Sequence, residues 1–127
     1  MKIAITIVRI LLGLIFTVFG LNGFLHFIPA GPLPPGPAGE YMTALFESHY
    51  FLVIGVFQVA GGLLLLVNRF VPLGLTFLGP VVVNIILYHA LLNSTGLPLA
   101  LTVSVLWGIL AFHYRRYFSS LFVQRAS

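Results

Sequence analysis

Four long apolar runs, separated by short breaks, constrain the fold of this chain more than any other feature. They cover approximately residues 3–28, 50–67, 71–92 and 97–114. Each is close to the roughly 20 residues that a helix needs to cross the hydrocarbon layer of a bilayer. Inside a bilayer every backbone N–H and C=O needs a partner, and a helix supplies them within one segment. The sequence therefore predicts an all-α, integral membrane four-helix bundle.

The composition leaves little room for anything else. Charged residues make up only 6% of the 127 residues, against about 25% in soluble domains. We expect a single transmembrane domain over residues 1–127, without a separate soluble domain. The first run is too long for a signal peptide and no A-x-A cleavage pattern follows it, so we expect an uncleaved first span. The chain has no Cys, which excludes thiolate metal sites and disulfides.

The breaks between the runs carry turn-forming residues. The first contains the proline- and glycine-rich stretch 29–39, the second is 68–72, and the third is 93–96, followed by Pro98. Proline fixes its own φ and is favoured in the first turn of a helix. We expect an ordered, Pro/Gly-rich outer loop after the first span and a last span that begins near Pro98.

The basic residues predict the orientation of the bundle. All six fall at the ends of the runs that share one side of the membrane, and the two acidic residues lie in the loop on the other side. The positive-inside rule then places both termini in the cytoplasm. The net charge of +4 is attributed to orientation and lipid headgroups, not to nucleic acid. The basic residues are Lys2, Arg9, Arg69, Arg115, Arg116 and Arg125.

The C-terminal tail carries apolar side chains at helical spacing. Tyr114, Phe118, Leu121 and Phe122 share one stripe, and Arg115 lies off it. This pattern is typical of a helix that lies along the membrane surface. We therefore expect a short C-terminal amphipathic helix.

Polar side chains recur at one depth of the expected bundle. At about 1.5 Å of rise per residue, the amides in the first three spans lie in the outer half of the bilayer, with hydroxyls of Thr102 and Ser104 at a similar depth in the fourth. Two histidines lie nearer the outer surface. Buried amide or ionisable groups in a membrane often mark a ligand path, so we predict an outward-facing, ligand-binding pocket. Its residues are Asn22, His26, Gln58, Asn84 and His89.

A second interpretation of these residues remains open. Polar side chains between membrane helices also serve as packing contacts of about 1 kcal/mol or less. Trp107 likewise has two interpretations, core packing or a wall for a flat ligand. We expect Pro80 to kink the third span, because it cannot donate to the carbonyl near Thr76. His49 is expected in solvent and His113 among headgroups. No metal site is predicted, since the spans contain neither carboxylates nor paired histidines.

Several stretches resemble the DoxX family of small bacterial membrane proteins. They are Phe19-Gly20-Leu21-Asn22-Gly23-Phe24 with His26, the proline run 32–39, Gly55 to Leu66, Arg69 to Gly74, and Pro80 through Asn84 to His89. The order and spacing of these stretches carry the resemblance, which covers the first three spans and, less distinctly, the fourth.

The resemblance implies a four-helix membrane protein linked to membrane oxidoreductase complexes and to quinone. The function expected from it is a small subunit of a quinone-linked redox system in the bacterial cytoplasmic membrane, with partner subunits. Where the family often has Glu, this chain has Gln58, and an amide cannot relay a proton. The alternatives are a non-catalytic protein that binds a lipid or assists assembly of a partner protein, and a small-solute transporter that works as a homo-oligomer.

Overall fold

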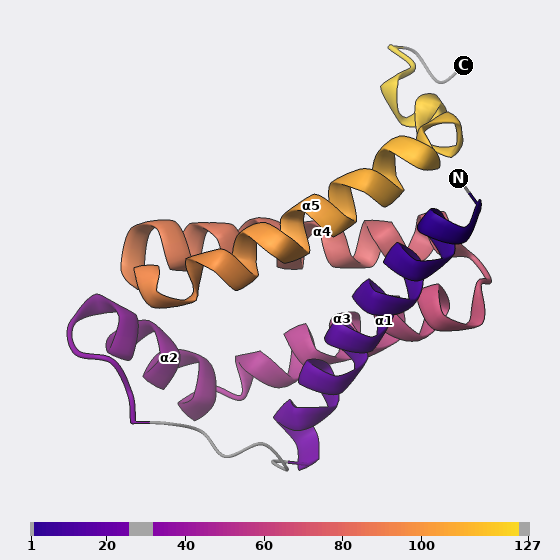
Figure 1. Cartoon of the computed structure of the whole chain (residues 1–127). Helices are drawn as coiled ribbons and strands as arrows, with labels where there is room; N and C mark the ends of the chain where they lie inside the picture. Colours follow the sequence, from indigo (N-terminus) through magenta and orange to yellow (C-terminus); the bar gives the residue numbers. More distant parts are fainter. Residues whose placement is uncertain (1, 26–31, 125–127) are drawn as a thin grey trace.

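The computed structural model describes residues 2–25 and 32–124, and these are almost entirely helical (Figure 1). No β-strand occurs among these described residues. The α-helices are α1 (Lys2–Leu25), α2 (Pro37–Glu47), α3 (Tyr50–Val67), α4 (Val71–Leu87) and α5 (Leu97–His113). A π-helical segment, η1 (Tyr88–Leu92), extends α4, and 3₁₀ turns form η2 (Ser94–Gly96), η3 (Arg115–Tyr117) and η4 (Ser119–Phe122).

The four long helices form a bundle that is closed on itself. Helix α1 packs against α3, α3 against α4, α4 against α5, and α5 returns to α1. Both ends of the chain lie at one end of the bundle, and α2 lies at the opposite end (Figure 1). Four helices are long and apolar enough to cross a membrane, when α4 is counted together with η1 and α5 together with η2. This confirms the predicted all-α fold with four apolar spans and fits a multi-pass membrane protein.

The first loop contains a helix that the sequence analysis did not predict. Pro37 occupies the first turn of α2, the position where its missing N–H costs nothing. Gly36, with φ 73°, turns the chain into this helix. The expected ordered Pro/Gly loop is therefore reduced, within the described residues, to the few residues from Pro32 to Gly36; the stretch 26–31 lies outside the described residues.

The C-terminal tail also differs from the prediction. Instead of one amphipathic helix, it forms the two 3₁₀ turns η3 and η4. The guanidinium of Arg115 donates to the carbonyl of Phe112 and lies over its ring, 4.2 Å from the ring centroid. Leu121 and Phe122 at the end of the tail are exposed. Tyr114 and Phe118 pack against the apolar core, and so short a segment gains little from forming a full helix.

Helices α1 and α3 approach each other closely because glycines face each other across the contact. A Cβ atom on Gly13 would lie 2.9 Å from the carbonyl oxygen of Gly62. A Cβ on Gly62 would lie 2.5 Å from Oγ1 of Thr17. Small residues that let two backbones approach are the common device of membrane helix pairs. The contact fixes the position of α3 against α1.

A second glycine pair joins the other face of α3 to α4. A Cβ on Gly61 would lie 3.0 Å from the carbonyl oxygen of Gly74, and one on Gly74 would lie 3.1 Å from the carbonyl oxygen of Gly61. Beside these pairs lies a fully buried apolar core drawn from all four long helices. Its largest members are Leu12, Phe16, Leu65, Leu75, Leu78 and Leu110.

Arg9 is buried inside the bundle, although the sequence analysis assigned it to the headgroup region. Its Nη1 donates to the carbonyl of Leu65 and, at 3.4 Å, to that of Leu66. These carbonyls belong to the last turn of α3, where a helix has no internal donors left. The guanidinium thus caps the C-terminus of α3 and ties α1 to it. The contact is favourable because the C-terminal end of a helix carries partial negative charge.

The glycine contact predicts a clear difference between two alanine substitutions. Gly62→Ala places a methyl against Thr17, and we expect it to lower the free energy of unfolding by about 1–3 kcal/mol, the usual cost of overpacking. Gly108→Ala is the matched control, because nothing lies within 4 Å of a Cβ there. Thermal unfolding of the detergent-solubilised variants measures both. Equal melting temperatures would contradict a tight α1–α3 contact.

Candidate ligand-binding site

A cavity of about 340 Å³ lies between α1, α3 and α4, beneath the loop helix α2. Four of the five predicted site residues line it together: Asn22, Gln58, Asn84 and His89. The fifth, His26, lies outside the described residues. The sequence therefore named side chains that the fold brings to one place, although they come from three different helices and a π-helical segment.

A smaller cavity of about 140 Å³ continues from this one toward α5. The two share four lining residues, which are Phe19, Gln58, Ile85 and His89. On the far side the smaller cavity ends at Leu99, Ala100 and Val103 of α5. Gln58 and His89 thus lie where the two cavities meet, near the centre of the bundle. We call the two spaces together the central cavity.

His89 is oriented by the chain that follows it. It lies in the π-helical segment, where the N–H of Asn93 donates to the carbonyl of Tyr88 at 3.0 Å. Nδ1 of His89 lies 3.0 Å from the carbonyl oxygen of Asn93. A carbonyl can only accept, so Nδ1 carries the hydrogen and Nε2 of the neutral ring is an acceptor. The imidazole packs directly on Gly96, where any side chain would collide with the ring.

Asn84 is held by the loop helix. The hydroxyl of Tyr41, on α2, lies 3.1 Å from Oδ1 and 2.9 Å from Nδ2 of Asn84. The ring of Tyr41 also packs on Tyr88, with centroids 5.4 Å apart. Tyr41 therefore anchors α2 over the cavity mouth. Tyr41 was not among the predicted site residues; the signal that would have identified it is the helix that begins at Pro37.

Gln58 is the polar group with most hydrogen-bonding capacity left for a ligand. Its side chain is half-buried on α3 and lines both parts of the central cavity. Within residues 2–25 and 32–124, no hydrogen bond engages its amide. An amide buried in an apolar environment without a partner costs a few kcal/mol. No Asp, Glu, Lys or Arg is among the residues that line this cavity, so it suits an uncharged ligand.

The last span contributes less polarity than expected. Thr102 and Ser104 donate to the carbonyls of Pro98 and Ala100 in their own helix, at 2.9 Å and 2.7 Å. Hydroxyls satisfied in this way leave little for other helices or ligands. The hydroxyls that α5 contributes to the predicted polar layer are therefore engaged within their own helix. Nε1 of Trp107 donates to the carbonyl of Leu75 at 3.0 Å, which favours the packing role for this residue.

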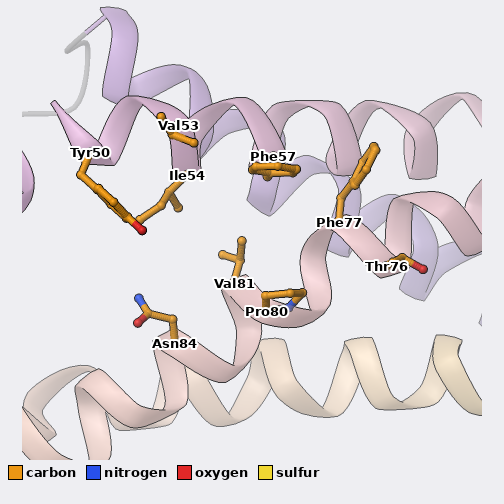
Figure 2. Close-up of a pocket in the computed structure, with 9 residues that line it drawn as sticks. All are labelled: Tyr50, Val53, Ile54, Phe57, Thr76, Phe77, Pro80, Val81 and Asn84. Atoms are coloured by element: carbon orange, nitrogen blue, oxygen red, sulfur yellow. The ribbon is translucent and has the colours of Figure 1, made fainter.

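A separate groove of about 400 Å³ runs between α3 and α4, and Figure 2 shows the side chains that line it. Its polar residues at one end are Tyr50 and Asn84; its other end is bounded by Phe57 and Phe77, whose rings meet edge-on at 5.6 Å. In Figure 2, α4 lies close to α3 at Phe77 and farther from it at Asn84. Pro80, between them, fits the predicted bend.

The remaining histidines lie away from the central cavity. His49 is exposed and adopts a left-handed conformation, with φ 60°, between α2 and α3. His113 lies beside Arg115 and Arg116 near the other end of the bundle. Among the described residues, no group of three or more His, Cys, Asp or Glu side chains is placed to hold a metal ion.

Comparison of the chain with protein-family models, with curated proteins and with solved structures gave no match. The resemblance to the DoxX family therefore stays a prediction from the sequence.

The bond between α2 and α4 leads to a testable prediction. Tyr41→Phe keeps the ring contact with Tyr88 but removes the bond to Asn84, a net loss of about 1 kcal/mol. We expect the amides of α2 to exchange with solvent about fivefold faster, because local opening becomes easier by that amount. Hydrogen exchange followed by mass spectrometry measures this. Tyr117→Phe is the control, since that hydroxyl bonds Arg116; equal exchange in both variants would show that Tyr41 does not anchor α2.

Proposed function

We propose that this chain is a small integral membrane protein that binds an uncharged, flat ligand of the quinone type in its central cavity. The observation that carries the proposal is the amide of Gln58, half-buried where the two parts of the cavity meet and with no bond to the described residues. Beside it the same cavity is lined by His89, whose Nε2 accepts when the ring is neutral. The pair offers both a donor and an acceptor to one ligand.

The chemistry of this pair suits either redox form of such a ligand. The amide N–H of Gln58 can donate to a quinone carbonyl. Nε2 of His89 can accept from a hydroxyl of the reduced form and can take up its proton. Aromatic and aliphatic side chains around them, such as Phe19 and Ile85, provide apolar walls, the usual make-up of a small-molecule site. Electron transfer itself requires a partner subunit that carries a redox centre.

We further propose that the chain is a DoxX-like subunit of a bacterial cytoplasmic membrane, with both termini inside. The described basic residues outside the core, including Lys2, Arg69 and Arg116, belong to the end of the bundle where the chain starts and finishes. Glu40 and Glu47 lie on α2 at the other end (Figure 1). This asymmetry supports the orientation through the positive-inside rule. The cavity would then open in the outer half of the bilayer.

The orientation is tested with single cysteines, since the chain has none of its own. In intact cells, Leu33→Cys before α2 should react with a membrane-impermeant maleimide, and Ser120→Cys in the tail should react only after the cells are permeabilised. Both positions are exposed, so burial does not limit labelling. The reverse pattern would overturn the proposed topology.

The site is tested by Gln58→Leu, which keeps the size of the side chain and removes its hydrogen-bonding groups. We expect binding of a benzoquinone to weaken by about tenfold at most, the equivalent of one net hydrogen bond. The melting temperature should hold or rise, because the described structure gives the amide no protein partner to lose. Quenching of the fluorescence of Trp107, the single tryptophan, measures binding in nanodiscs.

Thr102→Val is the matched control for this test. It removes a polar group of the predicted layer, but that hydroxyl bonds only its own helix, so quinone affinity should not change. Purified wild-type protein that binds no quinone but carries a stoichiometric phospholipid or partner chain would favour the non-catalytic role. If Gln58→Leu and Thr102→Val lower the quinone affinity equally, the polar groups act only in helix packing.

A further inference from the structure

We infer that the groove between α3 and α4 holds the hydrocarbon chain of the same ligand whose polar head occupies the central cavity. This inference rests on the proposed function and adds two points to it. The ligand is a single-chain, lipid-borne amphiphile, and it enters sideways from the bilayer between α3 and α4.

The groove and the central cavity adjoin each other. Three residues line both of them, namely Ile54, Val81 and Asn84. Ile54 and Val81 are aliphatic side chains on facing helices, and Asn84 marks the polar end of the groove. If the polar head of a ligand lies at Gln58 and His89, a chain attached to it would reach the groove by passing Ile54 and Val81.

The groove is polar at one end and apolar along the rest of its length, as the binding site of an amphiphile must be. The hydroxyl of Tyr50 and the amide of Asn84 lie at the end that adjoins the cavity. From there the lining is dominated by Val53, Phe57 and Phe77 (Figure 2). From Asn84 to Thr76 the groove follows α4 for about 12 Å, at 1.5 Å per residue. This length accommodates a medium-length alkyl or isoprenoid segment.

A hydrocarbon chain fits this groove better than a protein helix does. On α3 the groove runs from Tyr50, at the start of the helix, to Phe57, and on α4 it runs from Thr76 to Asn84. Within a membrane span only hydrocarbon or protein can fill such a groove. At one end the rings of Phe57 and Phe77 narrow it to an edge-on contact of 5.6 Å between centroids. A helix with its side chains is about 10–12 Å wide. Val53 and Phe57 are also partly exposed, at 56% and 43%, so the groove is open to lipid.

The test compares one ring with and without a chain. A methoxy-substituted benzoquinone and the same ring carrying a decyl chain are titrated against the full-length protein in nanodiscs, with Trp107 fluorescence as the readout. Moving a chain from lipid into a protein groove gains packing but no hydrophobic energy. We therefore expect Val53→Phe, which fills the groove, to weaken the affinity for the decyl compound modestly, by about threefold to tenfold. Affinity for the chainless ring should not change.

Val105→Phe on α5 is the matched control. It makes the same substitution at a position of similar exposure, 59% against 56% for Val53, but away from the groove, so both ligands should bind as to the wild type. Thr76→Phe fills the other end of the groove and repeats the test if Val53→Phe folds poorly. The decyl compound partitions into lipid equally for all variants, so this effect cancels when the affinity of each variant is divided by that of the wild type.

The outcomes separate this inference from the proposed function. If the wild type binds neither compound, the proposed function fails, and the inference fails with it. If the chainless ring binds but Val53→Phe and Val105→Phe give equal affinity for the decyl compound, only the groove assignment is wrong. If Val53→Phe removes a co-purified phospholipid, or a second copy of the chain, without weakening the decyl compound, the groove holds that occupant instead and the inference is overturned.

Discussion

The close approach of α1 and α3 at Gly13 and Gly62 is the contact on which the rest of the structure depends. The two backbones lie so close that a Cβ on Gly13 would be 2.9 Å from the carbonyl oxygen of Gly62, so the contact requires glycine on both helices. Because Gly61 offers a second such surface to α4, α3 is held between α1 and α4. Gln58 lies one turn from this double contact and is thereby fixed at the centre of the bundle. In a bilayer, apolar side chains gain little free energy by moving from lipid into a protein core. Close backbone packing of this kind then determines how the helices are arranged, a role that hydrophobic burial has in soluble proteins.

Most polar groups in the bundle are satisfied by the nearest available partner. Thr76, Thr102 and Ser104 bond carbonyls of their own helices, and Arg9 caps the end of α3. Against this background Gln58 differs, since it lines the central cavity, together with His89, and its amide has no hydrogen bond to the described residues. Its placement supports ligand binding over packing, because a packing contact would have joined it to a neighbouring helix.

The loop helix α2 and the groove give the proposed site two distinct boundaries. At the end of the bundle away from the termini, α2 covers the cavity and is tied to α4 through Tyr41 and Asn84. Toward the lipid, the groove between α3 and α4 leads to the same residues. If the bundle spans a membrane as proposed, a site covered by α2 and bordered by a groove between two spans would suit a ligand dissolved in the bilayer. It suits a small solute moving from one side to the other less well, so the geometry favours binding over transport.

The sequence by itself determined the helical class, the ranges of the four spans and the identity of the polar residues they carry, because apolar runs, prolines and turn residues act locally. It did not reveal α2, the π-helical turn at His89, the partner of Arg9 or the bond between Tyr41 and Asn84. Each of these depends on a segment distant in sequence or on a competition between nearly equal local conformations. Whether Asn84 and His89 could face one space was open from helical spacing alone. Tertiary packing decided it, because the positions of α3, α4 and α2 relative to one another determine which side chains share a cavity.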